Sequence, residues 1–492
     1  MGQESSNCRR RGVAAWVVLA CLAAWSACPP PSPRHTPGPE AGSWLYRGGG
    51  TQIEGVTGVR VDHAGNVYVA GWFQARIEIG PQHRVTRGKE DGFLLKLDRH
   101  GRLEWMTTLG GVGSDSVRAL EVGPMGDVYL AGSFSERLWL DMKKVTAPGR
   151  ALWVARVSSR GRVVWLRSYG ADSVWMAGVG VSRRGKVLLA ANFENSVSLG
   201  GRRVASASRY GANALVASLD DQGKMEWVVP LRSPHRVLLS DLAVDSDGAA
   251  AITGSFSHTV ALGRERGASR GGEDILLAKV GAKGAPEWLA AHGGPRDDLA
   301  HIICVDEQRA ITLAGTLRTP IRVGAHTVTP AGPSDIMVLR SDHTGVPDWA
   351  TTLGVHKGRP TAMTADRQGN VLVAGTFSGK ARVGGVASYA SLGTDDILLT
   401  EVNGRGQVTW SHTAGGVHTQ MVRGRDHRGR DSWIGLRDRA AGLAVTPDGR
   451  LVVAGEFVRK VRFGSRTAVA RGLTDVFVWQ VDRDTVGRVH VR

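Results

Sequence analysis

The chain has 492 residues, a formal net charge of +17 and four cysteines. Such a basic balance favours anionic partners, namely anionic glycans, lipid headgroups or acidic proteins. The sequence carries no DNA- or RNA-reading motif and no basic helix that could enter a groove, so we expect no nucleic-acid partner. The Cys and His spacings of a zinc site are also absent, so no metal site is expected.

The first 27 residues have the pattern of an export signal. Arg9–Arg11 form a charged start, and Gly12–Trp25 is apolar but too short to span a bilayer stably. Small residues precede Cys28, and here the segment resembles a bacterial lipoprotein signal, whose first mature residue is a lipidated cysteine. We therefore predict lipidation at Cys28. Cys21 is the competing site, and a plain secretory signal is the alternative.

Residues 28–43 are rich in Pro with Ser and Gly, a composition that favours extended, solvated chain. We expect this stretch to tether a folded body, residues 44–492, to the bacterial cell envelope, at the outer membrane or on the periplasmic side. Loss of residues 1–27 removes three Arg and one Glu, so the mature chain keeps a charge of +15.

The folded body retains a single cysteine, Cys304, which cannot form an internal disulfide. It lies in the apolar run of residues 301–305. A buried structural role is therefore expected in place of a reactive one.

A regular series of tryptophans organises the folded body. Neighbouring members are 60–62 residues apart, which indicates seven copies of one structural unit. The series is Trp44, Trp105, Trp165, Trp227, Trp288, Trp349 and Trp410. A tryptophan at one fixed outer-strand position is expected to act as a wedge that buries a large ring where two sheets diverge.

Each unit repeats three short aliphatic runs that are typical of strands, which in the first unit are residues 58–62, 66–73 and 91–98. The first run is small and apolar and suits the lining of a central channel. Asp, Gly and Asn separate it from the second run, as a tight hairpin requires. A Gly turn follows the third run, and the framing Trp belongs to a fourth strand.

Four short antiparallel strands per unit, a period of about 61 residues and no helical pattern predict an all-β fold, a seven-bladed β-propeller. A linear solenoid is the alternative. The chain starts on a fourth-strand sequence, Trp44–Arg47, and nearly ends after a third run, so we favour a closed ring whose last sheet is completed by the N-terminal strand. Some 17 residues between the second and third runs predict a small extra hairpin in each blade, which would decorate one face.

The repeat resembles the bacterial seven-bladed β-propeller repeat (SBBP) family, whose units carry a run of Asp, aliphatics, Lys, Leu, Asp, Gly, Trp and Leu-Gly-Gly. In the first unit this run is found in Asp91–Leu97, Gly101, Trp105 and Leu109–Gly111. The resemblance covers about residues 44–482. It implies the propeller fold in a family with many exported members, and it implies no shared catalytic motif.

The spacing Asp-x-x-Gly-x-x-x-Trp also resembles the tryptophan-docking motif of quinoprotein dehydrogenases, which would imply a quinone-cofactor oxidoreductase. The units of that family are shorter, so we expect the shared spacing to be a packing device, and we expect no cofactor. The acidic pairs Glu90–Asp91, Glu273–Asp274 and Asp395–Asp396 all open third runs. That shared place indicates a structural position rather than a catalytic pair of carboxylates.

The last unit contains the one large departure from the repeat, an insertion of 18 residues around residues 417–437. It carries His418, Arg423, Arg425, His427, Arg428 and Arg430, with Trp433 beside them. Basic groups next to an aromatic ring could grip a polyanion or a sugar, and a solvated irregular loop is the alternative. We expect this candidate partner-binding loop to stand above the channel mouth, because the connection it enlarges emerges on the same face as the extra hairpins.

The sequence therefore predicts a monomeric, non-catalytic binding or scaffold module, tethered to the cell envelope through its N-terminal lipid. The alternative is an enzyme with a site at the mouth of the channel. That alternative requires acid, base or metal-binding residues that converge from several blades.

Overall fold

The computed structural model describes residues 43–483, except residues 114, 171–172, 209–210, 386, 393–394, 417–419, 426–430 and 464–465. At residues 116, 420–425 and 431–436 it describes the backbone alone. The chain divides by its contacts into Met1–Arg34 and His35–Arg492, and every described residue belongs to the second part. The predicted signal, the candidate lipidation site Cys28 and tether residues up to 42 lie outside the described residues.

The described residues form an all-β structure, as the sequence predicts. They make strands and the turns between them, and none of them belongs to a helix. Accordingly, the part of the chain that is described offers no helix long and apolar enough to cross a membrane.

The strands follow the predicted repeat, with a first, second, third and fourth strand in each unit. First strands are β2 (Glu54–Val61), β8 (Ser116–Val122), β12 (Val174–Val181), β18 (Arg236–Val244), β22 (Leu299–Val305), β28 (Val355–Ala365) and β35 (Arg439–Val445). Second strands are β3 (Val67–Phe73), β9 (Val128–Leu140), β13 (Val187–Phe193), β19 (Ala250–Leu262), β23 (Ile311–Leu317), β29 (Val371–Val383) and β36 (Leu451–Phe457).

Third strands are β6 (Asp91–Leu97), β10 (Lys143–Val157), β16 (Asn213–Leu219), β20 (Glu265–Val280), β26 (Asp335–Ser341), β31 (Asp396–Val402) and β39 (Asp475–Val481). Fourth strands are β1 (Trp44–Gly50), β7 (Leu103–Gly110), β11 (Val163–Tyr169), β17 (Met225–Arg232), β21 (Pro286–His292), β27 (Pro347–Thr352) and β32 (Val408–Ala414). The pairing within a unit is antiparallel and in this order, as β2, β3, β6 and β7 illustrate.

The turn between the first and second strands owes its shape to an aspartate and a glycine. In the first unit the Asp62 carboxylate accepts the backbone N–H groups of Ala64 and Asn66, each at 2.9 Å. Gly65 adopts a φ of +83°, a conformation that a residue with a Cβ rarely takes. The predicted Asp, Gly and Asn chemistry therefore forms this hairpin.

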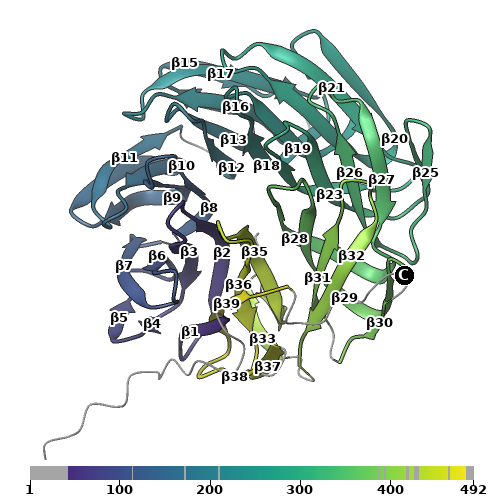
Figure 1. Ribbon diagram of the computed structural model, residues 1–492. Coiled ribbons are helices and arrows are strands. Elements are labelled where there is room, and N and C mark those ends of the chain that lie inside the picture. Colours follow the sequence, from purple (N-terminus) through teal and green to yellow (C-terminus); the bar gives the residue numbers. More distant parts are fainter. Residues whose placement is uncertain are drawn as a thin grey trace, which may run out of the picture. The chain divides into compact units, whose positions relative to one another are not determined.

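The two ends of the described chain meet in one sheet. The N-terminal β1 pairs antiparallel with β39, with Trp44 opposite Gln480, and Figure 1 shows the purple β1 beside the yellow β39. Because β36 occupies the other edge of β39, both edges of that strand are filled. The expectation that the N-terminal strand completes the last sheet is confirmed.

The first strands also contact one another in a closed series. Among the described elements, β2 contacts β8, and the contacts continue through β12, β18, β22, β28 and β35, which returns to β2. The core follows the same closure, because one buried cluster joins Val69 and Phe93 of the first unit to Val452 and Val478 of the last. Hydrophobic burial is thus distributed between neighbouring sheets.

Extra hairpins occur as predicted, and in three units they connect neighbouring sheets. Their separate strands are β4 (Arg76–Ile79), β5 (Gln82–Val85), β14 (Ser196–Leu199), β15 (Arg202–Ala205), β24 (Ile321–Val323), β25 (His326–Val328), β30 (Ala387–Ala390), β37 (Lys460–Phe463) and β38 (Arg466–Val469). In the second unit the second and third strands, β9 and β10, are long enough to form the hairpin themselves. In the fourth unit β19 and β20 do the same. Because β4 pairs with β1, β9 with β7 and β19 with β17, each of these hairpins adds to the fourth strand before it.

The insertion of the last unit contains a hairpin of its own. Strands β33 (Gln420–Arg425) and β34 (Asp431–Leu436) pair antiparallel. This hairpin comes shortly before Arg439, the first residue of β35. It therefore enters the fold at the N-terminal end of a first strand.

Candidate functional site

The first strands line a cavity of about 510 Å³, to which every described unit contributes residues. Each first strand has a bulge in its pairing with the second strand, where a single residue is extra, and β28 has a further irregularity between Val355 and Lys357. The extra residues are Thr57, Arg118, Ala177, Ser240, His301, Thr361 and Ala441, and all of them line the cavity. A β-bulge re-aims a side chain, so this repeated bulge determines which residues the cavity presents.

Two of the bulged residues hold neighbouring strands together. The Thr57 hydroxyl donates to the Val117 carbonyl oxygen at 2.7 Å, and the Ser240 hydroxyl donates to the Ala300 carbonyl oxygen at 2.9 Å. Each bond joins one first strand to the next. These hydroxyls therefore have a structural role.

Arg118 and His301 depart from the small residues at the other bulges. The His301 Nε2 atom lies 3.0 Å from the Thr316 hydroxyl. Burial, assisted by Arg359 and Arg318, lowers the pKa of His301 to about 4, so its ring is neutral near pH 7. Arg118 is exposed at the cavity.

An ion pair on the cavity wall joins two neighbouring units. The Arg60 Nε atom lies 3.0 Å from a Glu121 carboxylate oxygen, and this carboxylate raises the pKa of Arg60. Asp241 lines the same cavity, and burial raises its pKa to about 6. Both Asp241 oxygens accept backbone N–H groups, from Leu242 at 2.8 Å and Ile303 at 3.1 Å, so this carboxylate fixes the backbone.

Cys304 lies on the cavity wall. The prediction that it is buried is wrong in degree, because Cys304 is only half-buried and lines the cavity three residues after the bulge. Burial raises the pKa of its thiol to about 12, which disfavours the nucleophilic thiolate. Across the described residues, no group of three or more His, Cys, Asp or Glu side chains is arranged to hold a metal ion.

The framing tryptophans make a repeated contact between units. In six of the seven, the indole N–H donates to a backbone carbonyl of the following unit, in the turn between its third and fourth strands, at 2.8–3.3 Å. The donors are Trp44, Trp105, Trp165, Trp227, Trp288 and Trp349. In one such turn Gly406 has a φ of +79°, and a Cβ there would lie 2.9 Å from the Trp349 ring. The ring thus covers a position that excludes a side chain.

The same contact is incomplete at Trp410. This residue is buried, yet its indole N–H has no partner among the described residues. In the six other units a glycine lies three residues after the end of the third run. In the last unit the residue at this position is Thr485. Burial of the series is also uneven, because Trp105, Trp227 and Trp288 are half-buried and the others are buried.

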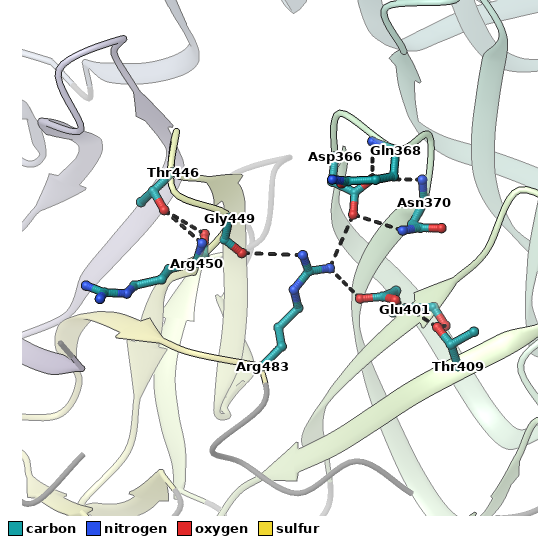
Figure 2. Close-up of polar contacts among 9 residues, drawn as sticks. All are labelled: Asp366, Gln368, Asn370, Glu401, Thr409, Thr446, Gly449, Arg450 and Arg483. Atoms are coloured by element: carbon teal, nitrogen blue, oxygen red, sulfur yellow. Dashed lines mark hydrogen bonds and ion pairs between the residues drawn. The ribbon is translucent and has the colours of Figure 1, made fainter. Parts of the chain in front are cut away.

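Arg483, which follows the third strand of the last unit, makes a network of polar contacts with the neighbouring unit (Figure 2). Its guanidinium lies 3.3 Å from Asp366, contacts Glu401, and donates to the Gly449 carbonyl oxygen at 3.3 Å. Glu401 occupies the third-strand position where four other units have Lys96, Arg156, Lys279 or Arg340. The last unit therefore supplies to its neighbour the cation that the neighbour's third strand lacks.

The acidic residues that open third strands bind backbone. Asp91, Asp274 and Asp396 each accept the N–H group four residues earlier, at 2.8–3.0 Å. Burial raises the pKa of all three carboxyls. Glu54 and Asp115 accept N–H groups in the same way at the start of the first strand, at 3.0 and 2.6 Å.

The candidate partner-binding loop is described in part. Arg423 and Arg425 belong to β33 and Trp433 to β34, for which the backbone alone is described. Arg428, Arg430, His418 and His427 lie outside the described residues. At the end of the loop, Arg437 pairs with Asp395 at 2.6 Å.

The sequence did not single out the cavity residues Arg60, Arg118, Glu121 and His301, nor Arg483. At the bulged position, the first strands of the other units carry Thr, Ala or Ser, so Arg118 and His301 are visible in the sequence as exceptions once the strands are aligned by register.

No protein-family model matches this sequence, and no curated protein matches it. Solved structures with a similar fold include puromycin hydrolase, whose S511A mutant in complex with PGG is 15% identical with a TM-score of 0.40 over 82% of this chain. This chain spans 58% of the puromycin hydrolase chain. Sqt1 from Chaetomium thermophilum is 10% identical, with a TM-score of 0.41 over 86% of this chain and 83% of Sqt1. The endosialidase of phage phi92 is 10% identical, with a TM-score of 0.37 over 90% of this chain and 69% of the endosialidase chain. At such values none of these likenesses assigns an activity to this chain.

Proposed function

We propose that this chain is an exported seven-bladed β-propeller, anchored through a lipid on Cys28, that serves the bacterial cell envelope as a non-catalytic binding or scaffold module. The closed series of contacts among the first strands supports the seven blades. The pairing of β1 with β39 supports a ring over a linear solenoid. The charged start, apolar stretch and Pro-rich tether of the sequence support the lipid anchor.

The observation that carries the binding role is the set of cations at one end of the first strands. The insertion joins β35 at that end. A separate hollow of about 530 Å³ is lined by Arg296, Arg318 and Lys357 and by one acid, Asp297, which lies 3.9 Å from Arg318. In contrast, the acidic groups of the cavity are occupied by Arg60 or by backbone N–H groups. This distribution favours capture of an anionic polymer over acid and base catalysis.

The binding role is tested by retention on heparin across a range of salt concentrations. Replacing Arg423, Arg425, Arg428 and Arg430 by Gln should lower the salt concentration at which the protein elutes, because exposed charges act over about 8–10 Å at physiological ionic strength. The matched control replaces four exposed hairpin arginines, Arg202, Arg203, Arg264 and Arg322. Equal loss of retention in both variants would show that total charge, and not the loop, determines binding.

The lipid anchor has its own test. Mass spectrometry of the mature protein should find an N-terminus at Cys28 with a diacylated thiol. An unmodified N-terminus downstream of Cys28, or a lipidated Cys21, would contradict this part of the proposal.

A further inference from the structure

The rim of the cavity is formed by the first-strand residues from two positions before the bulge to the bulge itself. It carries three arginines, of which Arg118 lines the cavity. Arg359 and Arg439 occupy the same register on β28 and β35, two residues before the bulge, and these two strands contact each other. Arg118 is the bulged residue of β8, beyond β2. At these two positions β2, which lies between β35 and β8, carries Gly55 and Thr57. The Trp72 ring of β3 covers Gly55.

Two of these arginines lack a counter-charge. Among the described residues, Arg118 and Arg359 are exposed and have neither an ion pair nor a side-chain hydrogen bond. Arg439 is bound to Glu456 at 3.1 Å and to the Val56 carbonyl oxygen at 3.3 Å. Guanidinium groups usually find carboxylate or carbonyl partners, so two unbound groups at one rim have donors to offer.

The acidic groups nearest to these arginines are already bound, since Glu456 pairs with Arg439 and accepts the Val56 N–H group. The enclosed position and the charges of Arg150 and Arg439 lower the pKa of Arg118, and Glu90 opposes them in part. Glu90 already accepts a hydrogen bond from Gln74 at 3.0 Å. The enclosed position and the charges of Arg439 and Arg437 likewise lower the pKa of Arg359. An anion between these arginines would relieve their repulsion.

The other side of the rim carries three large apolar side chains. At the register that Arg359 and Arg439 occupy, β12, β18 and β22 carry Trp175, Leu238 and Leu299. All three side chains are half-buried. The rim therefore offers hydrogen-bond donors on one side and apolar surface on the other, an arrangement suited to a ligand with a charged end and an apolar end.

We propose that this rim binds a small amphiphilic oxyanion, namely a phosphate monoester with an apolar substituent. The phosphate lies between Arg118, Arg359 and Arg439, and the substituent lies against Trp175, Leu238 and Leu299. A planar guanidinium matches the oxygens of a phosphate in pairs, and the two negative charges of a monoester suit two unpaired guanidinium groups. The site goes beyond the proposed function and does not depend on the insertion.

Isothermal titration calorimetry of the full chain at low salt tests the site with inorganic phosphate and phenyl phosphate as probes. We expect both to bind, with phenyl phosphate tighter. Arg359→Gln should weaken both about 10- to 100-fold, since a hydrogen bond to a charged group has that effect on affinity. Arg264→Gln, which removes an exposed arginine of a hairpin turn, is the matched control and should bind like the parent.

Trp175→Ala separates the two halves of the site. It should reduce the affinity for phenyl phosphate to that for inorganic phosphate and leave inorganic phosphate unchanged. If Arg359→Gln proves unfolded by circular dichroism, Arg359→Lys keeps the charge, loses the planar fork and should still weaken binding of both probes.

The proposal is overturned if the parent binds neither probe, or if Arg264→Gln weakens binding as much as Arg359→Gln. Equal effects of Trp175→Ala on both probes would overturn the apolar half. A variant without residues 417–437 should keep phenyl phosphate binding. If that variant also keeps heparin retention, the proposed function fails and the rim site stands.

Discussion

The outer edges of the sheets and the strands that line the cavity differ in how strictly they keep the repeat. At the outer edge, a Trp and a turn glycine recur from unit to unit with the same indole hydrogen bond. At the bulged position of the first strands, residues of very different chemistry occupy equivalent places, from Ala177 to Arg118 and His301. A residue that every unit repeats serves the packing of every unit. Departures from the repeat on a shared cavity identify the candidate site.

The largest effect is expected when the outer contact is removed at the closing strand. Trp44→Ala should cost about 3–5 kcal/mol of unfolding free energy, because it empties a buried ring site and weakens the pairing of β1 with β39. The matched control is Trp288→Ala, at the same position of an internal strand and half-buried. Urea unfolding measures both. An equal or larger loss for Trp288→Ala would contradict the special role of the closing strand.

Buried acids at the starts of first strands predict a pH dependence of stability. Burial raises the pKa of Glu54 to about 9 and that of Asp438 to about 7. The folded state therefore retains protons that the unfolded chain releases near pH 4, and stability falls as pH rises from about 4 towards 9. Each such group contributes up to about 1.4 kcal/mol per pH unit.

Glu54→Gln mimics the protonated acid and provides the check. The variant should lose less stability than the parent between pH 5 and pH 8, as measured by urea unfolding at both values. His292 and His301, whose pKa values burial lowers to about 4, act with the opposite sign below pH 6.5 and affect parent and variant alike. Parallel pH profiles for the two proteins would show that Glu54 is ionised in the folded state.

The Arg483 network tests how the last unit makes up for a missing contact. Arg483→Gln leaves Asp366 and Glu401 facing each other without a cation, and we expect a loss of about 1–3 kcal/mol. The double variant Arg483→Gln with Glu401→Gln should recover part of the loss, because one of the two unpaired carboxylates is gone. Thermal unfolding compares the three proteins. No recovery in the double variant would mean that Arg483 acts through packing alone.

The smallest effect separates Trp349 from Trp410. Trp349→Phe removes the indole bond to the Gly404 carbonyl oxygen, 2.9 Å long, and should cost about 0.5–1.5 kcal/mol more than Trp410→Phe, which removes no such bond. Equal losses in urea unfolding would indicate that the indole hydrogen bond adds nothing to the packing of the ring.

The regular part of the molecule could be predicted from sequence because its causes are local. Alternating aliphatic runs, Asp and Gly turns and the Trp spacing determine the strands, and a chain that begins with a fourth strand indicates how the last sheet is completed. The cavity could not be predicted in the same way. A bulge adds one residue to a strand and leaves no recognisable pattern in the sequence. That Arg118 and His301 face the cavity therefore follows only from the register between the first and second strands.

The Arg483 network has a different reason for escaping prediction. It joins residues 82 and 117 positions apart in the chain, so no local pattern connects them. The sequence nevertheless contains a trace of it, since Glu401 stands where Lys96, Arg156, Lys279 and Arg340 stand in other units. A break in a repeat is thus informative even where its partner is distant.

Closure of the ring by the N-terminal strand is tested most directly with an engineered disulfide. Tyr46 and Val478 lie opposite each other on β1 and β39, and opposite residues of antiparallel strands have Cα atoms about 4.5–5.5 Å apart, within the span of a disulfide. In a chain whose Cys8, Cys21 and Cys28 are replaced by Ser, Tyr46→Cys with Val478→Cys should oxidise in the folded protein to a fast-migrating cyclic product, and not in denaturant. Tyr46→Cys with Val453→Cys, on the strand beyond β39, should not. Failure of the first pair to link, or equal linking by the second, would contradict the closure of the ring.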